Sequence, residues 1–539
     1  MKSIQILVNW SLLVIFLLMV SSTNISPSSA ASVTVNEDTS WVQYVNKTRM
    51  LADIETLASD QYKGRYPATD GDELTLNYIN DQLSALNVTA LTTRNDFRQP
   101  FNIDPWTMPI VPINLVINGE TLDYGIDYVE LSYTGNASVT NSDLVFAGYG
   151  ISSSSFNDYS GIDVTGKIVV VCRGVPSGFP ADLSYHGYFG VKAQTAFAKG
   201  ATGMIVFTHP MSGSDGFIKG TLTSNNFIPD MGSICANRTS LELLGLSVTS
   251  WINGIDAAYS SGGSYYGSYS LDTEISATLE INVLYKKNAE SANIVAKFQG
   301  VASGSSERAI IVSGHHDHLG ESLVGTTYCG ADDDASGVAV VLEVARVLNE
   351  LYENNSFSKS IIIATWGAEE MGLLGAEHFV HVDPLFPLKQ IDLVIQHDMV
   401  GVGPVNGYLL VDGQSTISSS VIQSIRQAAT QYGSIQNVVT TNDHGSSDHA
   451  AFWERNVAAV NFYWDEEHPY LHTPQDTADR INPDILEKVA LTTLGYIIEK
   501  QNLLSDSNAS KTANSSPHLI VTSLLISLLV KNRRKRQKR

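Results

Sequence analysis

Cysteine is scarce in this chain. Only three cysteines occur among 539 residues, Cys172, Cys235 and Cys329, so at least one of them cannot pair within the chain. Small exported domains without a large core depend on dense disulfides, and the sequence excludes that class. Because single hydrophobic cores stop growing at roughly 250–300 residues, the length predicts two domains stabilised by buried apolar side chains.

Basic residues are also few. The chain has 33 Lys and Arg against 55 Asp and Glu, a formal net charge of −22. Seven of the basic residues fall in the final stretch "KNRRKRQKR", which leaves −29 on the rest of the chain. A body this acidic repels phosphate backbones, so we expect no nucleic acid partner.

Neither apolar stretch at the two ends is as long as a membrane-spanning helix. Lys2, the run "SLLVIFLLMV" and a small-residue site near Ser29 predict a signal peptide over residues 1–31 and therefore an exported, secreted or cell-surface protein. The C-terminal run "LIVTSLLISLLV" has 12 residues, fewer than the roughly 20 that span a bilayer. The basic cluster behind it resembles a stop-transfer tail. For residues 503–539 we weigh a membrane tether against a plain tail.

Seven Asn-x-Ser/Thr sequons after residue 31 fit an exported glycoprotein. They begin at Asn46, Asn87, Asn136, Asn237, Asn354, Asn508 and Asn514.

After the expected signal peptide, the sequence pattern changes from helical spacing to short β-type runs. Residues 40–136 open with helical spacing at Leu51, Ile54 and Leu57, which resumes at Leu76 after a Gly-containing loop. Residues 137–285 carry short β-type runs such as "KIVVVCRG" and "ATGMIVF" between turn-rich loops. We interpret the second segment as an inserted, mainly-β domain within a larger one.

Residues 286–502 alternate strand and helix patterns. The expected strands are "AIIVSG", "SIIIATW", "DLVIQHD", "GYLLVDG" and "VAAVNFYW", with helices from Ser336, near Leu373, near Val421 and from Pro483. This alternation predicts an α/β fold with a mixed, mainly parallel sheet and helices on both faces. In such sheets the chemistry collects at the carboxyl ends of the strands.

Three consecutive carboxylates, Asp332, Asp333 and Asp334, stand just before one of these helices. Taken alone they favour helix capping, which is common and contributes about 0.5–2 kcal/mol. Their spacing also approaches that of a calcium loop. The flank "LVGTTYCG" is no entering helix, however, and Val338–Leu342 is an apolar helix face rather than a loop.

Other ligand-type side chains follow the remaining strands. "SGHHDHLG" supplies His315 and Asp317, "WGAEEMG" supplies Glu369 and Glu370, "HDMVG" supplies Asp398, and "EEHPYLHTPQDT" supplies His472. Each alone is more often a solvated charge or a satisfied histidine. Together, at the ligand-binding edge of one sheet, they predict a functional site.

These motifs resemble, in order, those of the co-catalytic di-zinc exopeptidase family, which includes secreted aminopeptidases and glutamate carboxypeptidase. The resemblance extends from about residue 48 to residue 500. It covers "SGHHDHLG", "GADDDASG", "WGAEEMGLLGAEHF", "HDMVG" and "HTPQDTADRI". The stretch "VFAGYGISSSSFNDYSGIDVTGKIVVVCRG" is similar to the protease-associated domain often inserted in that family.

The resemblance implies two zinc ions and a role for each motif residue. His315 and Asp398 are the expected ligands of one zinc, Glu370 and His472 those of the other, and Asp333 bridges them. Two zinc dications bound to the same carboxylate lie close together and repel each other, and the negative charge of that carboxylate offsets the repulsion.

The adjoining residues have expected roles as well. Glu369 is the expected general base, and Asp317 is expected to orient the ring of His315. His316 and His318 are interpreted as supporting or structural.

Two further expectations follow from the family pattern. Members commonly have a cis peptide after the bridging Asp, here between Asp333 and Asp334. Many also place Tyr before the last His ligand, where this chain has Leu471, with Tyr470 one position earlier.

The implied activity is removal of N-terminal residues from peptides by attack of a di-zinc-bound hydroxide. A carboxypeptidase of the same family and a non-catalytic, receptor-like relative are the alternatives.

Overall fold

The structure is a computed structural model. It describes residues 39–503, apart from 93–95, 133, 155, 213–226, 262–274, 353–356, 414–416, 442–444, 446 and 466–467. The signal peptide expected at 1–31 lies outside the described residues, as does almost all of the C-terminal segment expected at 503–539. No helix among the described residues is long and apolar enough to cross a membrane.

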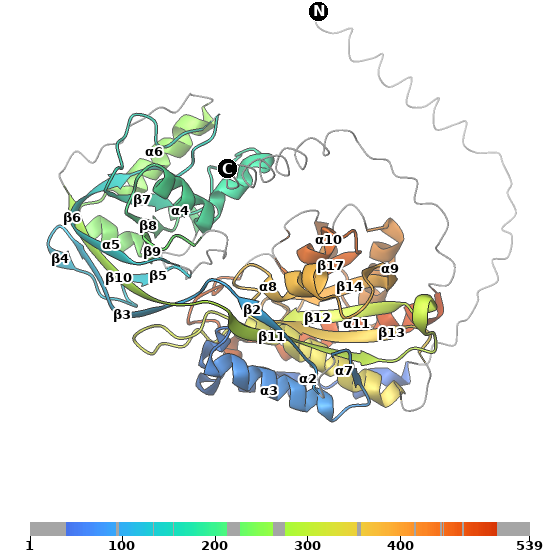
Figure 1. The fold of residues 1–539 in the computed structure, drawn as a ribbon. Coiled ribbons are helices and arrows are strands. Elements are labelled where there is room, and N and C mark those ends of the chain that lie inside the picture. Colours follow the sequence, from blue (N-terminus) through green and yellow to red (C-terminus); the bar gives the residue numbers. More distant parts are fainter. Residues whose placement is uncertain are drawn as a thin grey trace, which may run out of the picture. The chain divides into compact units, whose positions relative to one another are not determined.

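The first sheet contains all the strands predicted after residue 286. Among the described residues its order is β1-β11-β13-β12-β14-β17-β15-β16, with β2 also paired to β11 (Figure 1). The strands are β1 (Thr89–Ala90), β2 (Arg98–Ile103), β11 (Ala289–Phe298), β12 (Ala309–His315), β13 (Ser360–Trp366), β14 (Ile391–His397), β15 (Leu409–Gly413), β16 (Val438–Thr441) and β17 (Ala459–Trp464). The central four, β13-β12-β14-β17, are parallel, and the flanking pairings of β11 and of β15 with β17 are antiparallel.

The position of β12 between β13 and β14 decides where the chemistry lies. All seven residues of β12 are buried, as expected for an apolar strand covered on both faces. The chain leaves β12 for β13 on one side and later returns to form β14 on the other. Such a reversal of strand order opens a crevice at the carboxyl ends of the strands, and β12 ends there at His315.

Helices cover both faces of this sheet. The helix α7 (Gly337–Tyr352) packs on β12, β13 and β14, and α11 (Pro483–Leu503) packs on α7, on α2 (Lys47–Leu57) and on α9 (Ser419–Gln431). The short helices α8 (Leu374–Glu377) and α10 (His449–Trp453) lie on the opposite side from α2, α7 and α3 (Asp70–Ser84) (Figure 1). The predicted fold class, a mixed α/β sheet with helices on both faces, is confirmed.

The second sheet holds the inserted strands. Its order is β4-β3-β10-β6-β7-β8-β9-β5 among the described residues. The strands are β3 (Trp106–Ile117), β4 (Glu120–Thr121), β5 (Tyr128–Glu130), β6 (Ala137–Phe146), β7 (Ile168–Cys172), β8 (Gly203–Phe207), β9 (Gly232–Ala236) and β10 (Ser276–Lys286), accompanied by α4 (Phe189–Ala198), α5 (Arg238–Leu243) and α6 (Val248–Ser260). Strands β3 to β5 precede residue 137, so this sheet begins earlier than the expected insertion does.

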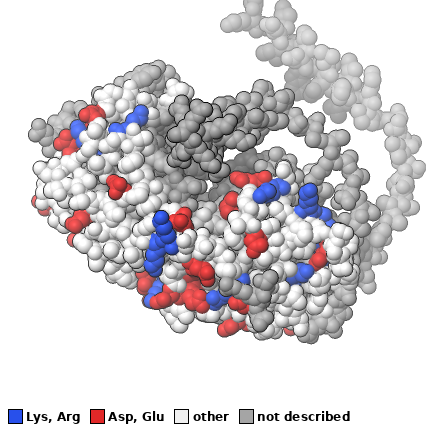
Figure 2. Space-filling model, viewed as in Figure 1, with Lys and Arg blue, Asp and Glu red and all other residues white. Residues whose placement is uncertain are grey.

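The surface drawn in Figure 2 carries acidic and basic side chains in small mixed groups. Among the described residues on that face there is no broad basic area.

A substitution at the centre of the first sheet tests how much its hydrophobic core contributes to stability. Ile311 on β12 is fully buried in a cluster with Ile362, Val394 and Trp366. We expect Ile311→Ala to lower the free energy of unfolding by about 2–5 kcal/mol, because it removes buried methyl groups and leaves a cavity. Urea denaturation measures the loss. Val301→Ala is the control, since Val301 is 69% exposed and its truncation should change stability by less than about 0.5 kcal/mol.

Candidate metal centre

The five predicted ligands converge at the carboxyl end of the first sheet. His315 is the last residue of β12, and Glu370 and Asp398 follow β13 and β14. Asp333 lies in the irregular turn Ala331–Ser336 that leads into α7, and His472 lies in the loop after β17. Residues as far apart as 315 and 472 therefore meet because parallel strands end at the same edge.

Asp333 stands at the centre of the group. Its Oδ1 lies 3.2 Å from Nε2 of His315, and its Oδ2 lies 3.1 Å from Nε2 of His472. The two oxygens of one carboxylate thus face two different histidines. Asp398 Oδ1 lies 3.7 Å from His315 Nε2, and Glu370 Oε2 lies 3.1 Å from His472 Nε2.

These separations lie within about 0.2 Å of those expected for donor atoms that share a metal ion. Two ligands bound to a tetrahedral zinc at about 2.0–2.2 Å lie about 3.3–3.6 Å apart. The contacts between His315, Asp333 and Asp398 form one such set, and those between His472, Asp333 and Glu370 form the other. The donors are imidazole nitrogens and carboxylate oxygens, the mixture that hydrolytic zinc sites use.

Several buried polar atoms of the group have no hydrogen-bond partner among the described residues. They include Glu370 Oε1 and Asp398 Oδ1, in side chains that are 4% and 11% exposed. Buried polar atoms are normally satisfied, so unpaired carboxylate oxygens beside the histidines of the group indicate a ligand. The residues present therefore fit a metal centre.

The pKa shifts of the group also indicate a metal centre. Burial alone would lower the pKa of His472, but Glu370 and Asp333 raise it to about 10. Burial opposes ionisation of Asp333, yet His315, His318 and His472 hold its pKa well below the ordinary value. The cluster therefore favours positive charge between its carboxylates, and a dication supplies that charge when protons leave the ligands.

His318 lies closer to the proposed ligands than expected for the supporting or structural role that the sequence suggested. Its Nδ1 is 2.8 Å from Glu370 Oε1, without hydrogen-bond geometry, and 3.8 Å from Asp333 Oδ2. His318, Asp333 and Glu370 could together hold a metal ion. The sequence signal was present in "HHDH", but spacing alone does not separate His318 from His315.

Asp334 also lies near His315 and Asp398, but its oxygens are already used. Its carboxylate accepts hydrogen bonds from the backbone amides of His315, Gly337 and Met399, at 3.0, 2.9 and 3.3 Å. It therefore ties the ends of β12 and β14 to the start of α7. The peptide bond between Asp333 and Asp334 is cis, as predicted from the family pattern.

Asp332 and Asp476 hold the preceding turn. Asp476 accepts the backbone amides of Asp332 and Asp333, and Asp332 Oδ1 accepts the amide of Gly401 at 2.6 Å. The other oxygen of Asp332 lies 3.3 Å from Nε2 of His468. Asp476 belongs to the "HTPQDT" motif, which could have marked it, although the motif gives no hint of its partner.

Asp317 holds the turn that carries the predicted general base, Glu369. Its carboxylate accepts the backbone amides of Glu369 and Glu370, at 2.9 and 3.2 Å. Its distance to His315 Nδ1 is 3.7 Å, longer than a hydrogen bond. The direct effect of Asp317 is therefore on the position of the Glu369–Glu370 turn.

Burial raises the pKa of Glu369 well above its usual value, and the carboxylates of Glu370, Asp448 and Asp398 raise it further against the opposing effect of His315. Its carboxyl group therefore holds a proton readily. Asp448 was missed by sequence analysis because its motif "GSSDHAAFW" reads as an ordinary helix start.

Tyr470, which lies two residues before the ligand His472, contacts an arginine. The ring of Tyr470 lies 3.9 Å from the guanidinium carbon of Arg480, a cation–π contact. Burial raises the pKa of Tyr463, near the end of β17, and the carboxylates of Asp332, Asp398 and Asp333 raise it further.

Arg65 supports the loops from behind and was not predicted. The buried guanidinium donates to the carbonyl oxygens of His316, Leu57, Cys329 and Gly330, at 2.6–3.0 Å. It therefore fixes the chain on both sides of the centre, next to His315 and just before Asp333.

We expect Arg65→Met to lower the free energy of unfolding by about 3 kcal/mol or more, because buried carbonyl oxygens would lose their donors. Thermal or urea unfolding measures this. The control is Arg308→Met, whose side chain is 44% exposed in an ion pair with Asp392, and whose loss should be about 1 kcal/mol or less. Equal losses in the two variants would contradict a supporting role for Arg65.

Metal content distinguishes the proposed ligand His472 from the nearby His318. We expect His472→Ala to retain about one zinc per chain fewer than the unmodified protein, because it removes a donor from one set. His318→Ala should retain both. Metal analysis after dialysis measures the zinc content. Loss of zinc in His318→Ala but not in His472→Ala would make His318 the ligand and His472 the supporting residue.

Two profiles of protein families match the chain. Residues 293–497 match peptidase family M28, and residues 133–237 match the PA domain.

Individual relatives agree with these matches. Aminopeptidase YwaD of Bacillus subtilis (strain 168) is 25% identical over 381 residues, which cover 69% of this chain and 70% of the relative. An aminopeptidase of Pseudomonas aeruginosa (strain UCBPP-PA14) is 25% identical over 432 residues, 77% of this chain and 70% of the relative. The crystal structure of BSAP, a zinc aminopeptidase from Bacillus subtilis, matches with a TM-score of 0.62 at 23% identity, covering 85% of this chain and 95% of the other.

Proposed function

We propose that this chain, which belongs to peptidase family M28 and carries a PA domain, is a zinc-dependent aminopeptidase. The family resemblance predicted from the motifs is thereby confirmed. The observation that carries the function is Asp333, whose two oxygens face His315 and His472 at 3.2 and 3.1 Å. Relatives named aminopeptidases support the reaction class, and the similarity to BSAP, a zinc aminopeptidase, supports zinc as the metal.

The proposed ligands follow from the two sets of contacts. His315 and Asp398 would hold one zinc, Glu370 and His472 would hold the other, and Asp333 would contribute to both. When bound, zinc polarises the carbonyl of the scissile peptide and makes a water molecule more acidic. The protein's part is to fix the donors, and the backbone hydrogen bonds of Asp317 and Asp334 do this at three strand ends.

Glu369 is the proposed general base. It takes a proton from the attacking water and returns it to the leaving amine. Its raised pKa suits it to this role, and so does its backbone, which is held by Asp317. Because Glu370 would bind the metal, the adjacent carboxyl group of Glu369 would remain free to accept a proton.

The acidic surroundings favour recognition of a substrate ammonium group. The carboxylates of the centre contact histidines and backbone amides among the described residues, and Arg65 uses its donors on carbonyl oxygens. A carboxypeptidase needs cationic groups that are free to hold a substrate carboxylate. We therefore favour attack at the N-terminus over attack at the C-terminus.

Hydrolysis of leucine p-nitroanilide tests the proposal. We expect activity that is lost on zinc chelation and recovered on adding zinc. Glu369→Gln should lower kcat about 10²–10⁴-fold with zinc content unchanged, because it removes the proton acceptor but no ligand. Glu377→Gln is the matched control, since Glu377 is a half-buried carboxylate in α8 and is expected to leave kcat unchanged.

Four outcomes would contradict this assignment. Full activity without zinc would remove the metal mechanism, and unchanged kcat in Glu369→Gln would remove the base. Cleavage of N-acetylated peptides at their C-terminus would favour the carboxypeptidase, whereas zinc-loaded protein with no hydrolysis would favour the receptor-like alternative.

We also propose that the protein is exported and acts on peptide N-termini outside the cytoplasm. The signal-peptide pattern of residues 1–31 and the sequons support this.

A further inference from the structure

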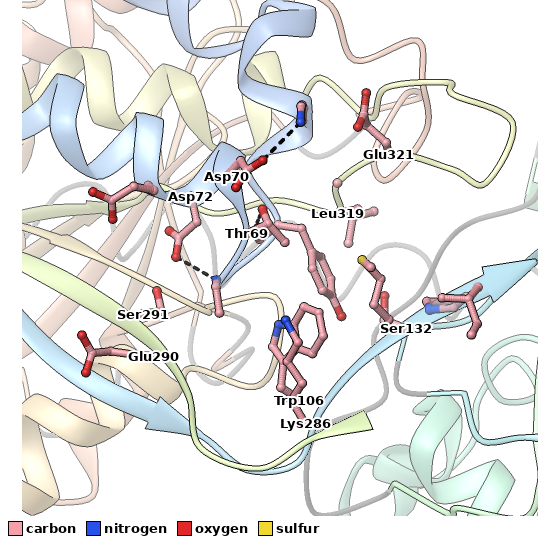
Figure 3. Close-up of a pocket in the computed structure, with 18 of the residues that line it drawn as sticks. Thr69, Asp70, Asp72, Trp106, Ser132, Lys286, Glu290, Ser291, Leu319 and Glu321 are labelled. Carbon is pink, nitrogen blue, oxygen red and sulfur yellow. Dashed lines mark hydrogen bonds and ion pairs between the residues drawn. The ribbon is translucent and has the colours of Figure 1, made fainter. Parts of the chain in front are cut away.

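The cavity drawn in Figure 3 lies beside α3 and has a volume of about 910 Å³. Two of its carboxylates have partners within the protein. Asp70 pairs with Lys63 at 3.6 Å, and Asp72 accepts the backbone amide of Ala68 at 2.8 Å. None of the lining side chains belongs to a group of described residues that could share a metal ion. Side chains that could hold a further ion therefore lie elsewhere.

One such group shares no residue with the metal centre and lies where α8 and α10 pack together (Figure 1). It contains Glu377, the last residue of α8, and His381, in the helical turn His378–Val382 that follows. Glu454, just after α10, is the third member. Glu377 and His381 are four residues apart, so they lie on the same face of the helix. The packing of α10 on α8 adds the third side chain from a distant part of the chain.

The ring nitrogen Nε2 of His381 is the common point of the group. It lies 3.4 Å from Oε2 of Glu377 and 3.5 Å from Oε2 of Glu454. Hydrogen bonds from N–H to oxygen are shorter, about 2.7–3.2 Å, whereas two donors on one tetrahedral zinc lie about 3.3–3.6 Å apart. Nε2 is also buried and has no hydrogen-bond partner among the described residues. The separations are those of donors on one ion.

Solvent reaches the side chains of this group. The side chain of His381 is 25% exposed, and those of Glu377 and Glu454 are 38% and 68% exposed. Nε2 itself is buried, but the two carboxylates beside it belong to these more exposed side chains, which can open and then close on an ion. An ion at this surface can also keep water molecules as further ligands.

The local charges favour a cation between the carboxylates. Burial raises the pKa of Glu377, His381 and Arg455 lower it, and the carboxylate of Glu454 raises it. The two glutamates therefore repel each other, and a positive ion between them relieves this repulsion.

Arg455 competes with a metal ion for the same imidazole. Its Nε donates to Nδ1 of His381 at 2.9 Å, so in this arrangement the hydrogen of the neutral ring is on Nε2. A metal ion on Nε2 requires that hydrogen on Nδ1, and Arg455 then has to turn away. Arg455 is exposed and can do so. Metal binding therefore replaces the contact with Arg455.

We propose that Glu377, His381 and Glu454 form a further, non-catalytic site for a divalent transition metal ion such as zinc. One imidazole nitrogen and two carboxylate oxygens suit zinc, whereas calcium and magnesium take oxygen ligands. The bound ion links α8 to the end of α10. Because the site takes no part in hydrolysis, Glu377→Gln weakens this ion but leaves kcat unchanged.

Calorimetric titration with Zn²⁺ at pH 7.5 tests the site. The zinc-loaded protein is first dialysed, so that loosely bound zinc is removed and the metal centre stays filled. We expect one further zinc ion to bind per chain. Mg²⁺ at the same concentration should not bind, because it does not favour an imidazole ligand.

Three variants and one control locate the ion. His381→Gln should weaken the further zinc at least about tenfold, because it removes the nitrogen donor. His378→Gln is the matched control, since His378 lies in the same helical turn but outside the group. Glu454→Gln should weaken zinc about threefold or more by removing a carboxylate. Arg455→Gln should tighten zinc about threefold by removing the competing cation.

Each result decides for or against the site. Loss in His381→Gln with retention in His378→Gln supports it, and so does tighter binding in Arg455→Gln. If His381→Gln does not fold, the exposed positions 454 and 455 still decide. No zinc beyond that of the metal centre, equal affinity in His381→Gln and the unmodified protein, or unchanged affinity in Glu454→Gln or Arg455→Gln would overturn the proposal. These comparisons concern one added ion, so their outcome does not depend on whether the chain hydrolyses peptides.

Discussion

The carboxylate of Asp333 is the contact on which the arrangement of the metal centre depends. It faces His315 through one oxygen and His472 through the other, so two clusters of donors share one residue. Three more carboxyl groups, of Glu369, Glu370 and Asp398, lie in the same buried group. Carboxylates this close repel one another in a low-dielectric interior unless cations lie between them. The fold therefore builds a place for positive charge.

The loops that carry these groups are held by other carboxylates rather than by apolar packing alone. Asp334 accepts amides from the ends of β12 and β14, Asp317 accepts amides from the turn after β13, and Asp476 accepts amides from the turn before α7. Each bond satisfies a backbone donor that a sharp turn would otherwise leave buried and unpaired. Arg65 satisfies the matching carbonyl oxygens.

Sequence patterns predicted the strands and helices of this half well. The strands β12, β13 and β14 are short apolar runs, and α7 and α11 follow helical spacing, so local physics specifies them. Local patterns did not reveal Arg65, which is 251 residues from His316, or the pairing of β2 with β11. Such contacts depend on the folded topology. The start of the second sheet at Trp106 was missed for the same reason, since β3 pairs with the distant β10.

Backbone conformation explains why four of the five proposed ligands lie in turns and loops, whereas His315 ends a strand. Ala368, Met399 and His472 have φ values of 56°, 62° and 55°, in the left-handed region that non-glycine residues rarely adopt. One lies just before Glu369, one just after Asp398, and one is itself a proposed ligand. Each such residue costs of order 1–3 kcal/mol and persists only where its surroundings enforce it. A strand that continued straight would send alternate side chains to opposite faces. The left-handed residues turn the chain at the sheet edge, and this turn brings carboxylates from adjacent strands to one point.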